Sequence, residues 1–337
     1  MSQSNYCILP AQADEAAYRS AMRDEIATWG KMDLDALSKT PINHPLLLAY
    51  KAKVLGGKAK TSNYSDWTDF LLGEFGPRTS CFSLGAGMGR IEEYLINSGF
   101  CTGFNSVELA GDAVRSSRER APDLKSVTGD LNFLELPRNS YDFILCHGVM
   151  HHLINVEHVM DQVNDALTDN GIFLLYEYIG EDRWQFEAST IEFLRKEFPG
   201  ETIEAPERWR VGGFESIRSA DICGIFEETF QGSIVRKVQY GGAYFPYITC
   251  AKSPSDESIQ RVVALDEATS KSAHPAACYM MAIARKSVRT APRATPWDVN
   301  EIHSRLMPPV PALEKIARWA RKTPIAPVIR RVKRLVA

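Results

Sequence analysis

The sequence predicts an α/β fold, a Rossmann-like doubly wound sheet that is mostly parallel. The first observation is a series of short apolar runs, which predict strands at residues 81–84, 103–107, 125–128, 143–146 and 172–177. The second is that helical patterns begin between them, near residues 89, 111 and 156. Strands separated by helices at this rhythm indicate a parallel sheet with helices on both faces. Two later runs, 232–239 and 278–284, are rich in β-branched or apolar residues and predict an antiparallel edge of the same sheet.

The chain divides into three predicted regions. Residues 1–77 form an N-terminal helical cap, in which Leu46, Leu47, Tyr50 and Val54 recur at helical spacing. Residues 78–286 form the α/β domain, with a charged and aromatic lid at 181–215. Residues 287–337 form a tail, because seven of the 18 prolines lie there and proline at that density disfavours packed structure.

The charge is distributed unevenly. The whole chain carries −3, but residues 287–337 hold 11 Lys and Arg against three Asp and Glu, a balance of +8 that leaves −11 for the rest. An acidic body argues against a nucleic-acid partner. The basic and apolar residues of the tail predict either a peripheral contact with an anionic membrane or a tail that is solvated or docked on its own acidic body.

The cysteines and the apolar runs bear on location. Seven scattered cysteines without a C-x-x-C pair indicate reduced thiols in a cytoplasmic protein. No apolar run approaches the roughly 20 residues that a membrane span needs. We therefore expect a cytoplasmic chain, with the inner membrane face as the alternative place for its tail.

A glycine loop follows the first predicted strand. Gly85, Gly87 and Gly89 follow that strand in the sequence GAGMG, and Arg90 begins the helix. Glycines are needed where the backbone takes positive φ or where a ligand lies against the main chain. The dinucleotide fingerprint has the spacing G-x-G-x-x-G, which is absent here. The spacing favours a cofactor without a pyrophosphate, such as S-adenosylmethionine, over a nicotinamide or flavin dinucleotide.

Two carboxylates follow the next two predicted strands. Glu108 lies 21 residues after Gly87, where an acidic side chain can accept hydrogen bonds from ribose hydroxyls. Asp130 follows the third strand, where it can meet an adenine amino group or cap a turn. Both lie at the carboxyl edge of the sheet, where open α/β folds bind ligands.

These features resemble the class I S-adenosylmethionine-dependent methyltransferase family over about residues 78–180. The resemblance implies an enzyme, and it implies a cofactor site made of Gly85, Ala86, Gly87, Gly89, Glu108, Leu109, Asp130, Leu131, Cys146 and His147. The family often has an acidic residue two positions before the first glycine, and this chain has Ser83 there. Segments such as HPLLLAY and YEYIGEDRWQF further resemble a bacterial subgroup associated with polysaccharide or secondary-metabolite genes.

The acceptor side is predicted from residues after the fourth and fifth strands. His151 and His152 are candidate bases, because histidine titrates near neutral pH, although such a pair can also just pack at a helix start. The catalytic set is completed by Glu177 and Arg183, and the substrate set is Tyr178, Trp184 and Arg218, since aromatic faces and an arginine fork suit a sugar ring or an anion. We expect no metal, because Gly148 argues against a helix that would bring His147 and His151 together.

The sequence thus predicts methyl transfer from S-adenosyl-L-methionine to a hydroxyl of a sugar, glycan or small natural product. A second hypothesis is a catalytically silent cofactor-binding or scaffold protein of the same fold. A third is an oxidoreductase that uses a dinucleotide. Neither the acceptor nor the oligomeric state follows from the sequence.

Overall fold

The computed structural model describes residues 7–8, 16–30, 43–56, 65–205, 214–270, 272, 274–288 and 293–297. Its main element is a seven-stranded sheet with the order β4-β3-β2-β6-β7-β9-β8. The strands are β2 (Cys81–Leu84), β3 (Phe104–Glu108), β4 (Leu124–Thr128), β6 (Tyr141–His147), β7 (Leu167–Tyr178), β8 (Ile234–Tyr240) and β9 (Tyr279–Arg285). Among the helices in the described part of the chain, none is long and apolar enough to cross a membrane.

The sheet is mostly parallel, as predicted. Strands β4, β3, β2, β6 and β7 pair in parallel, and β9 runs antiparallel to both β7 and β8. The two late apolar runs are thus β8 and β9, with β8 at the edge. Outside this sheet, β1 (Cys7–Ile8) pairs with β5 (Leu134–Glu135). The predicted Rossmann-like fold class is confirmed.

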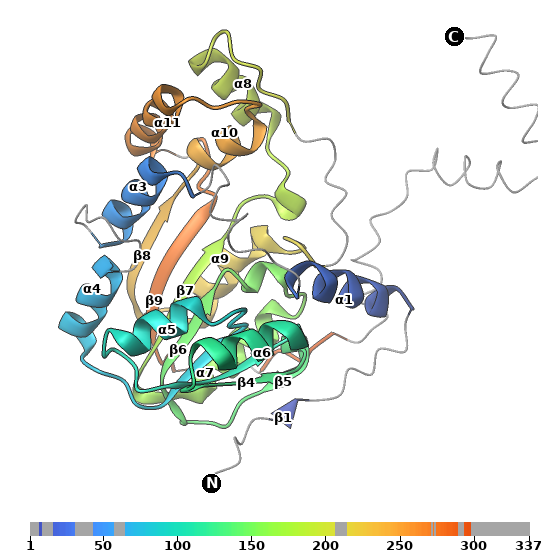
Figure 1. Cartoon of the computed structure of the whole chain (residues 1–337), viewed down its shortest axis with the longest axis vertical. Helices are drawn as coiled ribbons and strands as arrows, with labels where there is room; N and C mark the ends of the chain where they lie inside the picture. The colour runs from blue at the N-terminus through green and yellow to red at the C-terminus, as the bar shows by residue number, and fades with distance from the viewer. Residues whose placement is uncertain are drawn as a thin grey trace, which may run out of the picture.

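Helices cover the sheet on both faces (Figure 1). Those that the structure describes are α1 (Ala16–Trp29), α3 (Pro45–Gly56), α4 (Ser65–Phe75), α5 (Arg90–Asn97), α6 (Gly111–Arg120), α7 (Val156–Ala166), α8 (Ala188–Glu197), α9 (Ser219–Thr229), α10 (Tyr244–Cys250) and α11 (Asp256–Thr269). Three short 3₁₀ helices are η2 (Leu131–Phe133), η3 (Met150–His152) and η4 (Asp182–Trp184). The loops between strands and helices at the carboxyl edge position the site.

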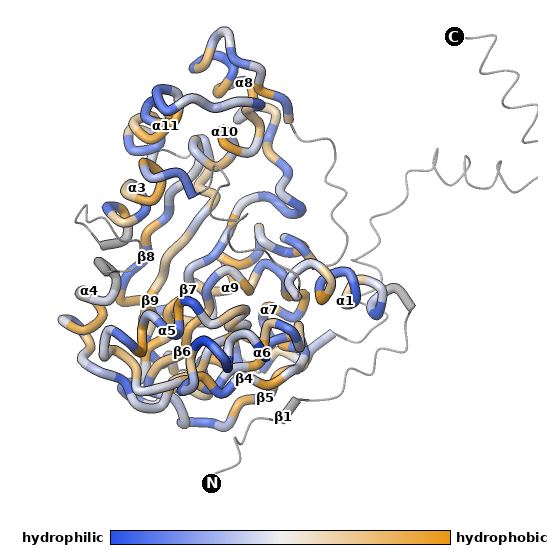
Figure 2. Tube along the Cα trace, viewed as in Figure 1, coloured by the Kyte–Doolittle hydropathy of each residue, from blue (hydrophilic) through white to orange (hydrophobic). Residues whose placement is uncertain are grey.

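The core divides between the two faces because side chains alternate along each strand. On β6, Phe143 and Leu145 face one cluster with side chains of α3, α4 and α5, whereas Ile144 and Cys146 face the other with α7 and α9. In Figure 2 hydrophobic residues gather along the central strands and on α10, and hydrophilic ones are common on outer segments such as α6 and α8. Two buried faces explain why these strands read as continuous apolar runs.

The lid, the N-terminal cap and the start of the tail lie at different places in the described chain. In the lid, α8 packs beside α10 and α11, where Glu197 pairs with Arg261, and these helices lie at the top of Figure 1, apart from α1. The helix that covers the site is α1, from the N-terminal cap. The start of the tail lies on α7, with Ala294 N donating to Asp161 and Trp297 N donating to Asn155. The predicted basic end, 298–337, lies outside the described residues.

Candidate functional site

The glycine loop forms the turn between β2 and α5. Gly85, Gly87 and Gly89 have φ of +63°, +52° and +74°, the left-handed region that favours glycine. A Cβ on Gly85 would lie 2.8 Å from the side chain of Val149, and one on Gly89 would lie 2.8 Å from that of Leu124. A Cβ on Gly87 would meet no atom within 4 Å. The loop therefore packs tightly at its two ends and faces open space at its centre.

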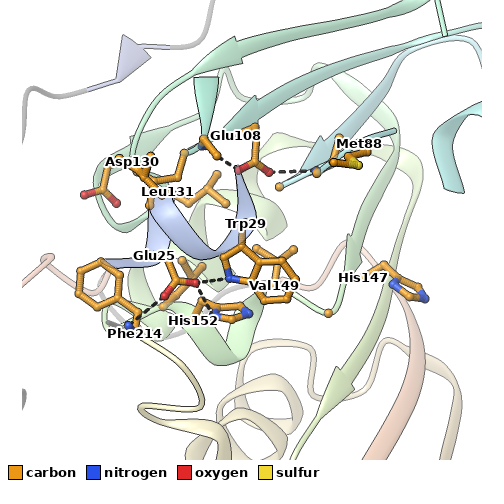
Figure 3. A pocket seen from close by; sticks show the side chains of 18 of the residues that line it. Glu25, Trp29, Met88, Glu108, Asp130, Leu131, His147, Val149, His152 and Phe214 are labelled. Atoms are coloured by element: carbon orange, nitrogen blue, oxygen red, sulfur yellow. Dashed lines mark hydrogen bonds and ion pairs between the residues drawn. The ribbon is translucent and has the colours of Figure 1, made fainter. Parts of the chain in front are cut away.

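A cavity of about 230 Å³ lies between this loop and α1 (Figure 3). Most of the residues predicted to bind the cofactor line it: Gly85, Ala86, Gly87, Glu108, Leu109, Asp130, Leu131 and His147. They come from the carboxyl ends of β2, β3, β4 and β6, so the parallel sheet brings them to one edge. The cavity is the hollow that the sequence predicts at this place.

Glu108 lies against the glycine loop. Its Oε2 accepts a hydrogen bond from the Gly87 amide at 2.9 Å, and its Oε1 accepts one from the Ala110 amide at 3.0 Å. Figure 3 shows the carboxylate beside the loop, on the cavity wall. Each carboxylate oxygen has a second lone pair, so both can still accept from a ligand hydroxyl. The geometry suits the predicted contact with ribose.

Asp130 closes the other end of the cavity together with α1. The Tyr18 hydroxyl donates to Asp130 Oδ2 at 2.5 Å, and the Asn132 amide donates to Oδ1 at 2.9 Å. Burial raises the pKa of Asp130 above its ordinary value, against the lowering effect of these hydrogen bonds. Asp130 therefore caps η2 and anchors α1, and the residue is also part of the cavity wall.

Two predicted cofactor residues lie elsewhere. Cys146 is fully buried in the core cluster of α7 and α9, because alternation on β6 turns it away from the cavity. Gly89 precedes the first residue of α5 and packs on Leu124 and Ser117, so it shapes the loop without lining the cavity. His147, the last residue of β6, lines the cavity and stacks on Tyr176 at 4.5 Å. Burial lowers the pKa of His147 to about 4, so it is neutral at pH 7.

His151, a predicted base, is held between two carboxylates. Its Nδ1 pairs with Glu177 Oε1, and its Nε2 lies 3.4 Å from Glu215 Oε1. Burial alone would lower the pKa of His151, but the charge and hydrogen bond of Glu177, helped by Glu215, raise it to about 10. An imidazolium that keeps its proton at pH 7 cannot accept another one. The structure therefore gives His151 a charge-pairing role instead of the predicted one.

Glu177 is the buried anchor of this region and lies outside the cavity lining. Its carboxylate accepts hydrogen bonds from the amides of Val149 at 2.9 Å, Met150 at 2.6 Å and Tyr178 at 2.7 Å. Burial would raise its pKa, but the pairing with His151 lowers it below the ordinary value. Glu177 thus fixes the turn from β6 into η3 and is ionised, whereas the sequence predicted it to be catalytic.

His152 does line the cavity, and Glu25 of α1 holds it (Figure 3). Glu25 Oε1 lies 2.8 Å from His152 Nδ1 and accepts from the Trp29 indole at 2.6 Å, while Glu25 Oε2 accepts from the Phe214 amide at 3.1 Å. Burial would raise the pKa of Glu25, but the hydrogen bond and charge of His152 lower it. Apart from this ion pair, neither ring nitrogen of His152 has a hydrogen bond among the described residues, and both are buried.

The other predicted catalytic and substrate residues are engaged in the protein itself. The Arg183 guanidinium donates to the Glu215 carbonyl at 3.0 Å, and the Tyr178 hydroxyl donates to the Glu181 carbonyl at 3.1 Å. The ring of Trp184 packs against Tyr178 and Phe245. Arg218 forms a fork on Glu157, with N–O distances of 2.6 and 2.7 Å, and lies over the Trp297 ring. Arg183, Tyr178, Trp184 and Arg218 therefore do not line the cavity.

Donor atoms of His151, His152 and Glu215 lie within 4.8 Å of one another, a spacing that could hold a metal ion. Glu177 holds Nδ1 of His151, and Glu215 lies 3.4 Å from its Nε2. We therefore describe this group as a buried network of charges that joins η3 to Glu215.

The sequence reasoning missed one side of the cavity. Glu25, Ile26 and Trp29 of α1 line it together with Phe214, and Glu92, on the loop side, was missed as well. The α1 residues are separated from the loop by more than 50 positions, and nothing in their local pattern pointed to a ligand. Ser83 did carry a signal, since the absence of the expected acidic residue there called for another carboxylate nearby.

The cavity fits S-adenosylmethionine on three observations. The open face of Gly87 lets a ligand approach the main chain, Glu108 offers carboxylate lone pairs, and Leu109 and Leu131 provide an apolar wall for a flat ring. The spacing of the loop, G-x-G-x-G in place of the dinucleotide fingerprint G-x-G-x-x-G, favours an adenosyl amino acid over a dinucleotide.

Of the comparisons with known proteins, the match to a family model supports this assignment. Residues 82–175 match the family described as "Methyltransferase domain". No curated protein matches the chain. Similar solved structures include an S-adenosylmethionine-dependent methyltransferase from Mesorhizobium loti, with 16% identity, 66% of this chain and 97% of that chain covered, and a TM-score of 0.41.

The names of two further similar proteins of known structure give different methyl acceptors. One is the geranyl diphosphate C-methyltransferase of Streptomyces coelicolor A3(2), with 11% identity, 81% and 100% of the two chains covered, and a TM-score of 0.46. The other is the phosphoethanolamine N-methyltransferase 2 of Haemonchus contortus, with 14% identity, 75% and 60% covered, and a TM-score of 0.41. Likeness at this level says nothing about the acceptor of the present chain. Residues 82–175 carry a methyltransferase domain, and the expectation of an enzyme that uses S-adenosylmethionine is confirmed for this part of the chain.

Proposed function

We propose that the chain transfers a methyl group from S-adenosylmethionine to a hydroxyl of a small acceptor, with His152 as the base. When bound, S-adenosylmethionine would supply a methyl group from its sulfonium to the acceptor oxygen, with S-adenosylhomocysteine as the leaving group. A hydroxyl must lose its proton as it attacks, so a base within reach accelerates the reaction. The observation that carries the proposal is the pair of Glu25 and His152 on the wall of the cofactor cavity.

Glu25 orients His152. The lowered pKa keeps Glu25 ionised, and the Trp29 indole and the Phe214 amide donate to its two oxygens and hold them in place. The Glu25 carboxylate lies 2.8 Å from His152 Nδ1, so the opposite ring nitrogen, Nε2, is the one left for the acceptor. In the proposal, Nε2, which is buried without a hydrogen bond among the described residues, takes the proton of the acceptor hydroxyl.

The walls around His152 exclude water. Trp29, Val149, Leu153 and Phe214 line this side of the cavity, and the Trp29 ring lies edge-on to His152 at 5.2 Å. An apolar wall protects the reacting groups from solvent and strengthens the interaction between His152 and Glu25. α1 contributes both the carboxylate and much of this wall, so the proposal makes α1 a part of the active site.

The finer acceptor class rests on resemblance. A sugar, a glycan or a secondary metabolite was expected from the bacterial subgroup and from Tyr178, Trp184 and Arg218. Those three side chains are engaged in internal contacts in the described chain, so they add no support for a sugar ring. Our proposal therefore specifies a hydroxyl and keeps the sugar or natural product as its first candidates.

The test is label transfer from methyl-labelled S-adenosylmethionine to small molecules in an extract of the source cells, with mass spectrometry of the product. We expect the His152→Gln variant to lose about 10²- to 10⁴-fold in rate, the usual contribution of a general base. Its affinity for S-adenosylhomocysteine should be unchanged, because Nε2 acts on the acceptor. The matched control is His44→Gln, since His44 pairs with Asp256 on another part of the chain.

Two results would count against the proposal. A His152→Gln variant that transfers label at the native rate would remove the base, and an N- or C-methylated product would remove the hydroxyl. The catalytically silent alternative predicts that the native chain binds S-adenosylhomocysteine but labels nothing in any fraction.

A further inference from the structure

Glu92 places a carboxylate beside Ser83, the position at which the sequence has no acidic residue. It lies in the first turn of α5, directly after the glycine loop, and only 3% of it is exposed. The Ser83 hydroxyl donates to Glu92 Oε1 at 2.6 Å. Ser83 stands on β2 two residues before Gly85, where the related enzymes often have a carboxylate. The structure thus places a carboxylate from α5 beside Ser83, where the family would have had an acidic side chain on β2 itself.

The second oxygen of Glu92 has no partner. Oε2 is buried without a hydrogen bond in the described part of the chain, although the residue lines the cofactor cavity. Arg90 and Ile91 of the same turn also line it, so the first turn of α5 faces the hollow. A buried carboxylate oxygen that lacks a donor is costly, and proteins rarely keep one without a reason. A positively charged donor on a ligand would satisfy it.

We propose that Glu92 binds the amino group of the methionine part of S-adenosylmethionine, with Ser83 as its positioning residue. The inference rests on the cofactor and is independent of the acceptor and of His152. Glu108 and Asp130 are already committed to the loop amides and to Tyr18 at the other walls. Among the described carboxylates that line the cavity, Glu92 is the one with an oxygen left unbonded.

The charge of Glu92 argues against a purely structural role. Holding the Ser83 hydroxyl needs one neutral acceptor, which a glutamine would also provide. Burial, with a smaller contribution from the charge of Glu108, raises the pKa of Glu92 to about 7 in the absence of ligand. An ammonium at Oε2 would hold the carboxylate ionised and repay part of its burial.

The test compares two ligands by titration calorimetry on the full chain. S-adenosylhomocysteine has the amino group, and 5′-methylthioadenosine shares its adenosine and sulfur but lacks the amino acid. We expect Glu92→Gln to weaken S-adenosylhomocysteine about 10- to 100-fold, the size of a charge-assisted hydrogen bond, and to leave 5′-methylthioadenosine unchanged. The Ser83→Asp/Glu92→Gln double variant should recover most of the loss.

The matched control is Glu93→Gln, because Glu93 follows Glu92 but pairs with Arg120. An equal loss for both ligands, or no loss for either, would overturn the proposal. If Glu92→Gln does not fold, the pH dependence of ligand binding to the native chain provides the test. Its affinity for S-adenosylhomocysteine should then fall below about pH 7, whereas that for 5′-methylthioadenosine should not. The other groups that face Glu92 are Ser83, Glu108 and Cys101, and both ligands would report them alike.

Discussion

The two sides of the cavity are built in different ways. The side formed by the loop and the ends of β2 to β4 is held by main-chain geometry, such as the positive φ of Gly87 and its bond to Glu108. The opposite side, with α1 and η3, is held by side chains that are far apart in the sequence, as in the bond from the Phe214 amide to Glu25 across 189 positions. Main-chain geometry leaves a sequence motif, and long-range ion pairing does not.

The largest effect is expected on the second side, at His151. Replacing it in His151→Gln leaves Glu177 buried and ionised without its cation, which costs about 3–5 kcal/mol of unfolding free energy. The raised pKa gives the sign of the pH dependence. The stability from His151 is fully present below about pH 6.5 and is lost as the pH rises towards about 10.

Denaturant titrations of the native chain and the variant between pH 6 and 10 measure this difference. The gap between the two curves should narrow as the pH rises. A constant gap would mean that the charge on His151 contributes nothing and that the two sides of the cavity are held alike.

On the loop side we expect a loss of binding without a loss of fold. Gly87→Arg fills the open space above the loop, so the affinity for S-adenosylhomocysteine should fall at least about 100-fold, or about 2.7 kcal/mol. Gly99→Arg is the matched control, since Gly99 also has positive φ and an open Cβ position but lies outside the cavity. Equal losses in both variants would show that backbone strain, and not the filled hollow, is the cause.

The same contrast explains how far the sequence could predict the molecule. Strand positions were predictable because both faces of the sheet are buried, and Phe143–Cys146 of β6 is apolar throughout. The places of Glu108 and of the glycine loop in the site could be predicted from the spacing of these residues along the chain. Cys146 was assigned to the cofactor site by the resemblance alone, whereas the alternation of side chains along β6 turns it into the core.

The residues that the sequence assigned to the acceptor show the limit of such reasoning. Arg183, Tyr178 and Arg218 are polar or aromatic residues at a promising edge. The Tyr178 hydroxyl donates to the carbonyl of nearby Glu181, whereas the oxygens that bind Arg183 and Arg218 come from other segments. Glu25 could not be found, because its role depends on where α1 packs. Whether His151 or His152 is free to accept a proton depends on the same long-range contacts.

The smallest effect is expected at Glu92, because its pKa shift is opposite in sign to the shifts of the carboxylates on the other side of the cavity. Glu25 and Glu215 have their pKa lowered by a histidine, whereas burial raises the pKa of Glu92 from 4.5 to about 7. Below about pH 4.5 the carboxyl is protonated in both folded and unfolded chains and costs nothing. Above it the unfolded chain loses its proton first, so the folded state is penalised by up to about 3 kcal/mol once the pH passes 7.

Glu92→Gln should therefore stabilise the ligand-free chain at pH 8 by about 1–3 kcal/mol and leave it unchanged at pH 4, as thermal or denaturant unfolding would show. S-adenosylhomocysteine should reverse the order at pH 8, because it stabilises the native chain more than the variant. A variant that is less stable at both pH values would mean that Glu92 already has its cation within the protein.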